Sequence, residues 1–317
     1  MPKPRAQLVS VEATTYYHCI SRCVRRAFLC GEDHATGKNF DHRKQWLVDK
    51  FKELAGVFAV DICAYAVMSN HFHLVLHIDR EKARAWSDEE VKERYASLFP
   101  QRVEDCKMLP AEAKATRVAT WRERLWSLSW FMRCLNESIA RRANREDECS
   151  GRFWEGRFYS QALLDEGALL TCMSYVDLNP IRAGMACTVE ESEFTSVRER
   201  LATSSAAADL VPFSDECDER FTERLPATRQ DYIDLLRWAA GEVTSSSAGT
   251  VPASTHATLD RLGIQSANFV EGVRQFSRSF FTMVGAVHLI DAESGRRGYK
   301  RRPGRTAAGK LYQPRAA

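Results

Sequence analysis

The chain has 317 residues, and its 44% hydrophobic content supports a sizeable buried core, which excludes a largely disordered chain. Lysine and arginine number 45 against 42 acidic residues, so the net charge of +3 indicates nothing about partners by itself. The N-terminal sequence lacks the apolar core of a signal peptide and no run of about 18 apolar residues occurs, so we expect a cytoplasmic protein that does not enter a membrane.

The first part of the chain predicts a strand, a helix and a hairpin. Residues 15–22 (TYYHCISR) are rich in β-forming side chains and predict a first strand. A segment with apolar residues at helical spacing follows and stops at Gly56. Residues 60–68 predict a second strand, and Ser69-Asn70 predicts the turn of a hairpin because asparagine tolerates positive φ.

The middle of the chain is mainly helical in pattern. Residues 79–124 are rich in charge, and prolines interrupt their helical patterns, so we interpret them as a helical insertion at the edge of the core. Residues 126–145 predict a long amphipathic helix. Residues 166–178 predict a further helix, which Asn179-Pro180 ends.

The composition changes past residue 200. Segments rich in serine, alanine and threonine indicate linkers, and the short helical patterns between them predict a small helical C-terminal region over residues 201–295. Residues 296–317 contain no acidic side chain and predict a flexible basic tail, which would attract phosphate backbones without reading sequence.

The stretch VMSNHFHLVLHI, residues 67–78, places three histidines at even spacing. On a strand, His71, His73 and His77 share one face, and two imidazoles at i and i+2 lie about 7 Å apart at their Cα atoms, within reach of one cation. Two ligands are half a metal site, and the pair fits two hydrogen-bonded or exposed histidines as well. We expect His77 to be hydrogen-bonded or exposed. His18 either approaches from a neighbouring strand or lies in the core.

A possible complement to the histidines is the helix end SYVDLNP. Tyr175 and Asn179 stand at i and i+4, so a phenol and an amide oxygen would lie on one face of the helix and could face the same cation. Taken alone, a tyrosine near a helix end is usually a packing residue, and an asparagine before proline is usually a stop signal. Asp177 points away from Tyr175 on a helix.

Three segments in order carry a resemblance to a known family. They are HFH on a strand, GRFWEGRF at residues 151–158 and YVDLNPIRAGM at residues 175–185. Together they resemble the single-tyrosine HUH transposases, and specifically the REP-associated tyrosine transposases of bacteria, over about residues 10–200. The resemblance implies an α+β fold, with residues 1–200 forming a catalytic domain built on a ferredoxin-like antiparallel sheet with helices on one face.

The resemblance also implies the chemistry and the partner. It implies that His71, His73 and Asn179 bind a divalent metal, Mg²⁺ or Mn²⁺, and that Tyr175 attacks single-stranded DNA at hairpin-forming palindromes. Attack would leave a 5′-phosphotyrosine and a free 3′-OH, so rejoining needs no ATP. A phenol with an ordinary pKa of about 10 needs a base or a nearby cation to become a good nucleophile. Tyr159 is less suited, since its strand-like context suggests packing or base stacking. Monomer and homodimer both stay open.

Arginines interleaved with aromatic residues predict a surface that tracks phosphates and stacks unpaired bases. The alternative is that the aromatic rings belong to the core and the arginines are solvated. Arg182 could contact DNA or simply brace its loop. The candidate DNA-binding residues are Arg22, Arg25, Arg26, Arg142, Arg152, Trp154, Arg157 and Arg182.

Two other functions fit the same residues. One is a domesticated relative that keeps the fold and binds DNA without cleaving it. The other is a zinc metallohydrolase that uses His71, His73 and His77. Formation of a covalent DNA adduct that depends on Tyr175 separates transposition from both.

Overall fold

A computed structural model of the protein describes most of the chain. The described residues are 8–24, 29–33, 37–203, 209–244 and 250–312. Within these ranges, no helix combines the length and the apolar character that crossing a membrane requires.

A five-stranded sheet lies at the centre of the molecule in the order β4-β5-β1-β6-β7. The first four strands pair antiparallel, and β7 runs parallel to β6. The strands are β1 Tyr16–Arg22, β4 Val60–Val67, β5 His71–Ile78, β6 Tyr159–Leu163 and β7 Met283–Val284. A separate ribbon pairs β2 Glu32–Asp33 with β3 Lys38–Asn39.

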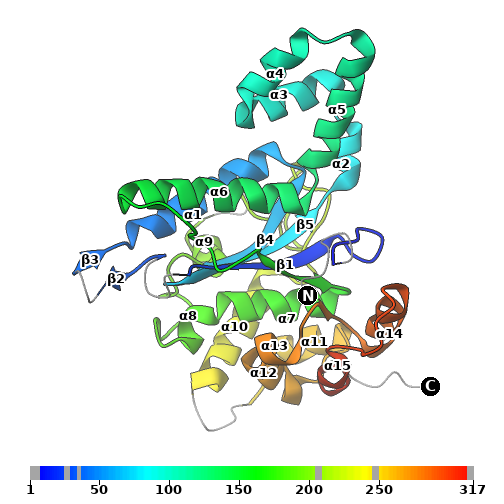
Figure 1. The fold of residues 1–317 in the computed structure, drawn as a ribbon. Coiled ribbons are helices and arrows are strands. Elements are labelled where there is room, and N and C mark those ends of the chain that lie inside the picture. Colours follow the sequence, from blue (N-terminus) through cyan, green and yellow to red (C-terminus); the bar gives the residue numbers. More distant parts are fainter. Residues whose placement is uncertain (1–7, 25–28, 34–36, 204–208, 245–249, 313–317) are drawn as a thin grey trace.

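The connections between the strands make the core ferredoxin-like. Helix α1 (His42–Val57) joins β1 to β4, the hairpin leads to β5, and α6 (Leu128–Glu146) precedes β6. This is the β-α-β-β-α-β order of that fold. Helices α1 and α6 cover the same face of the sheet (Figure 1), and the buried guanidinium of Arg43 on α1 forms an ion pair with Glu146 at the end of α6. The predicted α+β class is confirmed.

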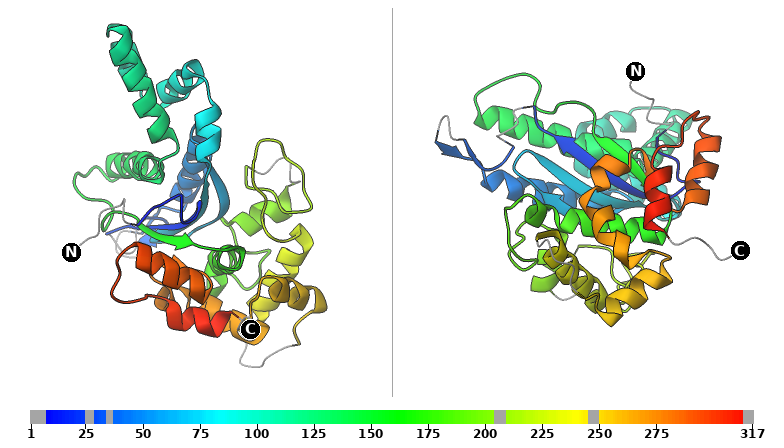
Figure 2. Two further views of the ribbon diagram at one scale, coloured as in Figure 1. Left: turned by 90° about the vertical axis from the view of Figure 1, so that its right-hand side faces the viewer. Right: turned by 90° about the horizontal axis from the view of Figure 1, so that it is seen from below.

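The opposite face of the sheet is covered as well, which the expectation of helices on one face did not include. Helix α7 (Glu166–Asp177) packs directly on this face, and the C-terminal helices lie beyond it (Figures 1 and 2). With both faces covered, every residue of β4 and β5 except His71 is buried. The further helices are α8 Asn179–Arg182, α9 Ser196–Ala202, α10 Arg229–Thr244, α11 Ala253–Arg261, α12 Ser266–Arg274, α13 Phe276–Ser279, α14 Val287–Arg296 and α15 Arg305–Leu311.

Four helices form an arm that projects from the α1/α6 side (Figure 2, left) and correspond to the expected insertion over residues 79–124. The arm has a small hydrophobic core of its own, in which the rings of Tyr95 and Trp121 stack at 4.7 Å between centroids. The helices are α2 Arg80–Ala85, α3 Asp88–Leu98, α4 Pro100–Lys107 and α5 Ala111–Leu125.

The C-terminal region is part of the core architecture. Strand β7 extends the central sheet, and α15 lies in the segment that the sequence predicts as a flexible basic tail. That expectation is wrong as far as residue 312, because Leu311 and Tyr312 are buried and anchor the helix. Residues 313–317 lie outside the described part.

Asp165, which caps the N-terminus of α7, ties this helix to the C-terminal region. Its carboxylate accepts hydrogen bonds from Ala168 N, Ala286 N and the hydroxyl of Tyr312, each at 2.7 Å. A Cβ at Gly167 would lie 3.0 Å from the Tyr312 ring, so the ring packs closely against the helix backbone. One carboxylate therefore positions α7 relative to β7 and α15.

We expect Asp165→Ala to lower the free energy of unfolding by about 2–4 kcal/mol, because it removes a helix cap and leaves two further donors without an acceptor. Tyr312→Phe removes one of these bonds and should cost about 1 kcal/mol. Urea titration followed by circular dichroism measures both. An Asp165→Ala protein that is no less stable than Tyr312→Phe would contradict this role of the carboxylate.

Candidate active site

Three imidazoles meet on the face of the sheet that α7 covers. The antiparallel register pairs Ile20 with His73 and Arg22 with His71, which brings His18 on β1 beside His73 on β5. His18 Nε2 lies 2.9 Å from His73 Nδ1, and their rings stack at 5.1 Å between centroids. The rings of His71 and His73 are 4.8 Å apart. The sequence left two placements open for His18, and in the structure His18 lies beside the pair of His71 and His73.

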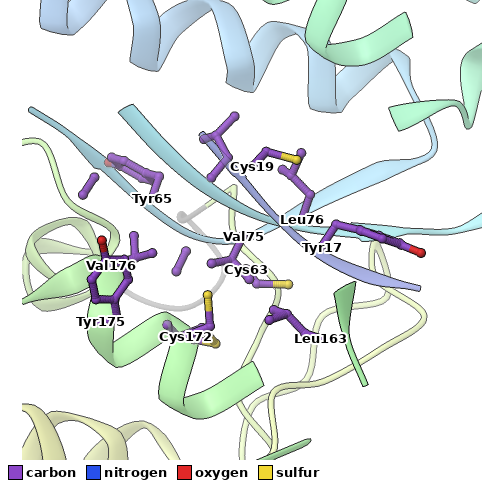
Figure 3. Close-up of a cluster of buried hydrophobic side chains, with 14 of the residues drawn as sticks. Tyr17, Cys19, Cys63, Tyr65, Val75, Leu76, Leu163, Cys172, Tyr175 and Val176 are labelled. Atoms are coloured by element: carbon purple, nitrogen blue, oxygen red, sulfur yellow. The ribbon is translucent and has the colours of Figure 1, made fainter. Parts of the chain in front are cut away.

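Tyr175 reaches this cluster from α7. Its ring lies edge-on to His73 at 5.5 Å and to His18 at 5.9 Å between centroids. Figure 3 shows Tyr175 and Cys172 pointing from α7 toward the sheet. Two segments about a hundred residues apart in the sequence therefore meet in the fold.

Burial keeps the histidines neutral at pH 7. It lowers the pKa of His18 and of His71 to about 4, in the latter case with help from the Arg22 charge, and it lowers the pKa of His73 well below its usual range. A neutral imidazole keeps one nitrogen lone pair that can bind a cation. His73 Nε2 is buried and has no hydrogen-bond partner within the described part of the chain.

Asn179 and Arg182 lie at the end of α7. Asn179 is 7% exposed and begins α8, and its Oδ1 is 3.4 Å from Arg182 Nη1. The guanidinium of Arg182 lies over the Tyr175 ring at 4.8 Å and donates to the carbonyl of Arg274 at 2.8 Å. Arg182 therefore braces this loop, one of the two roles open to it, and the Asn179 amide oxygen accepts from its guanidinium.

The side chains at this site could bind a metal ion only through a mixture of nitrogen and oxygen ligands. No group of three His, Cys, Asp or Glu side chains in the described ranges could hold an ion. A site here would combine the imidazoles of His71 and His73 with an oxygen such as that of Asn179. Nitrogen and amide oxygen ligands together suit a divalent ion of the Mn²⁺ type. The orphaned Nε2 of His73 is the observation that supports the fit.

His77 is outside this cluster. It is buried and its Nδ1 lies 3.1 Å from Asp61 Oδ2, as expected for a hydrogen-bonded histidine. It follows His71 by six residues, about 20 Å along a strand. The three-histidine zinc site is therefore not assembled, and the metallohydrolase hypothesis loses its ligand set.

Two residues that the sequence analysis missed complete the cluster. Phe276 on α13 is buried and stacks on the Tyr175 ring at 4.8 Å, which leaves Tyr175 only 4% exposed. Gln161 on β6 places its Oε1 2.7 Å from His18 Nδ1. A glutamine next to the apolar run Ala162–Leu164 is a weak signal for such a role, and nothing in the sequence around Phe276 indicates its position.

A basic groove adjoins the cluster. It has a volume of about 300 Å³, and its wall includes Arg22, which pairs with His71 across the strands, and Gln161, which bonds His18. One acidic side chain, Glu155, also lines it. The complete lining is Ile20, Arg22, Glu155, Gly156, Arg157, Tyr159, Gln161 and Ser277. Two of the predicted DNA-binding arginines, Arg22 and Arg157, thus line this groove, and Arg22 lies beside His71.

Other candidates lie elsewhere. The expectation of a stacking face at Trp154 is wrong, because the ring is 9% exposed, packs against Phe72 and donates to the carbonyl of Asn136 at 2.8 Å. Arg152 donates to the Trp154 carbonyl at 2.8 Å. Arg142 lies over the Trp46 ring on the α1/α6 side. Arg25 and Arg26 lie outside the described residues.

Asp177 faces away from the cluster, as predicted. Burial raises the pKa of its carboxyl, which accepts hydrogen bonds from Ser196, Val197 N and Tyr232. These contacts anchor the C-terminal end of α7 on the side opposite Tyr175.

Comparisons with known proteins add one remote likeness. No protein-family model and no curated protein matches the chain. A solved structure of a REP-associated tyrosine transposase bound to a REP hairpin aligns with 69% of this chain and 98% of its own length, at 14% identity and a TM-score of 0.39. A likeness at this level carries no functional argument, so the proposal below is argued from the residues and their geometry.

We expect Phe276→Ala to expose the Tyr175 ring, because Phe276 is the aromatic side chain stacked on it. Nitration of Tyr175 by tetranitromethane, followed by peptide mass spectrometry, should then be several-fold faster than in the parent protein. Phe269→Ala is the matched control, since Phe269 is an equally buried ring of the same region that packs on Trp238. Equal nitration rates in the two variants would contradict the role of Phe276 as a cover.

Proposed function

We propose that this chain is a tyrosine transposase of the HUH type, which cleaves and rejoins single-stranded DNA through Tyr175. The observation that carries the proposal is the position of the Tyr175 ring, 5.5 Å from a buried imidazole whose Nε2 has no partner in the described ranges. A phenol beside an imidazole nitrogen that could bind a metal ion supports a role for Tyr175 in phosphoryl transfer. The preference for hairpin-forming palindromes rests on the resemblance of the sequence motifs.

The reaction exchanges one phosphodiester for another. The Tyr175 oxygen forms a bond to phosphorus, the bond from phosphorus to the 3′ oxygen breaks, and that oxygen takes up a proton to become a 3′-OH. The Tyr175 proton passes to a base in solution. Attack of a second 3′-OH on the phosphotyrosine reverses these steps on another strand, so the bond energy is retained.

Residues of this chain supply the electrostatics. The Arg182 guanidinium lies over the Tyr175 ring and places a positive charge beside the phenol that would react with the phosphate. His71, His73 and Asn179 would hold a divalent ion, Mg²⁺ or Mn²⁺. When bound, such an ion polarises the scissile phosphate.

The rival proposal, binding of DNA without cleavage, has one observation in its favour. Tyr175 is 4% exposed and Phe276 stacks on its ring, so α13 covers the ring of the proposed nucleophile in the described arrangement. On the cleavage proposal, binding of DNA in the groove beside Ser277 displaces this cover. On the rival proposal the cover stays in place.

We expect the protein to form a covalent adduct with a single-stranded hairpin oligonucleotide in Mn²⁺, seen as a shifted band on a denaturing gel. Tyr175→Phe should abolish the adduct while hairpin binding persists. Tyr159→Phe, which changes the tyrosine beside the groove, should retain it. Phe276→Ala should increase its yield.

A wild-type protein and a Phe276→Ala variant that both bind hairpins and yield no adduct on any of them would establish the rival function. An adduct that survives Tyr175→Phe would exclude Tyr175 as the nucleophile.

We further propose that the basic groove holds the DNA backbone. In EDTA, and in a Tyr175→Phe background, Arg22→Ala should weaken hairpin binding and lower the slope of log K against log salt by about 0.7 to 0.9, the loss of one phosphate contact. Arg141→Ala removes the same charge from α6, where it pairs with Glu137, and should change neither value. Equal slopes for both variants would place the DNA elsewhere.

A further inference from the structure

A chain of hydrogen bonds runs behind the histidine pair. The Nε2 amide of Gln161 donates to the Phe280 carbonyl at 2.6 Å, and Gln161 Oε1 lies 2.7 Å from His18 Nδ1. His18 Nε2 lies 2.9 Å from His73 Nδ1. His18 is fully buried, His73 is 2% exposed and Gln161 is 1% exposed, so these contacts are shielded from bulk solvent.

The donor and acceptor of every hydrogen bond in this series follow from the bond between Gln161 and the Phe280 carbonyl. A backbone carbonyl only accepts, so the Gln161 NH₂ must face Phe280 and its oxygen must face His18. That oxygen also only accepts, so the proton of neutral His18 is on Nδ1 and its Nε2 is bare. His73 must then carry its own proton on Nδ1 to donate to His18. The remaining nitrogen, His73 Nε2, is left as a lone pair.

The opposite assignment of the histidine protons fails at Gln161, where the series of hydrogen bonds begins. A proton on His73 Nε2 would make His18 the donor at Nε2 and leave a lone pair on His18 Nδ1. Gln161 would have to turn its amide to donate to that lone pair. Two carbonyl oxygens, of Gln161 and Phe280, would then face each other at 2.6 Å.

We propose that Gln161 and His18 are positioning residues that hold His73 with its proton on Nδ1 and present its bare Nε2 to a divalent cation. The inference rests on the proposed function for the identity of the site. A ligand histidine usually donates its second N–H to an acceptor that sets ring orientation and tautomer, and here a second histidine is that acceptor. His71 follows the same pattern, since its Nδ1 lies 2.5 Å from Asn70 Oδ1.

Two experiments on the 317-residue chain test the proposal. In ¹⁵N-histidine-labelled, metal-free protein, two-bond ¹H–¹⁵N spectra should assign the proton of His18 and of His73 to Nδ1. Titration with Mn²⁺, followed by electron paramagnetic resonance, should show affinity falling about 10- to 100-fold in His18→Leu and Gln161→Leu. His18→Gln keeps an acceptor for His73 and a donor for Gln161, and should retain most of the affinity.

His77→Leu is the matched control for stability, because it also removes a buried, hydrogen-bonded histidine from the sheet but far from the cluster. It should lower the melting temperature without changing Mn²⁺ affinity or the His73 tautomer. A proton on His73 Nε2, unchanged affinity in both leucine variants, or absence of Mn²⁺ binding to the wild type would each overturn the proposal. The adduct assay with Tyr175→Phe decides the proposed function separately, so a protein that has the tautomer and the affinity but forms no adduct supports this inference alone.

Discussion

The burial of α7 between the sheet and the C-terminal helices is the constraint on which the candidate site depends. Every residue from Gly167 to Asp177 is buried, so the helix has no solvent face and its position is determined by packing on all sides. Asp165 anchors its first turn through Ala286 and Tyr312, and Asp177 anchors its last turn through Tyr232. Between these anchors, Tyr175 can point only at the histidine face of the sheet. The C-terminal region thus contributes to the site by positioning a helix that precedes it in the sequence.

The same burial has two opposing effects on chemistry. It keeps His18, His71 and His73 neutral, which suits a cation ligand, because a protonated imidazole cannot bind a metal. It also places Phe276 on the face of the Tyr175 ring. The described arrangement therefore brings the imidazoles and the phenol together and covers the phenol ring.

Local charge matters more here than net charge. The net charge of +3 for the whole chain indicates no partner, yet Arg22 and Arg157 line one groove and Arg182 lies over the Tyr175 ring. Arginines on the other side, such as Arg141 with Glu137 and Arg43 with Glu146, are taken up by ion pairs within the helical layer. Arg182, beside Tyr175, also contacts Asn179 Oδ1 and the Arg274 carbonyl.

Local pattern in the sequence determined the elements and much of the site. Strand alternation placed His71 and His73 on one face and the turn at Ser69-Asn70 specified the hairpin, since both follow from short-range backbone geometry. Tyr175 and Asn179, expected at i and i+4 of one helix, lie on the successive helices α7 and α8. Which residues far apart in the sequence contact each other was decided by the tertiary structure. The register of β1 against β5 brought His18 to His73, and the return of the C-terminal region to β6 set Gln161 and Phe276 in place. The bond between His18 and His73 spans 55 positions of the sequence, and the bond between His18 and Gln161 spans 143. No local periodicity encodes such contacts, because they form only when distant segments pack together. The basic C-terminal segment became a helix for the same reason, as Leu311 and Tyr312 gained an apolar surface that the sequence alone does not reveal.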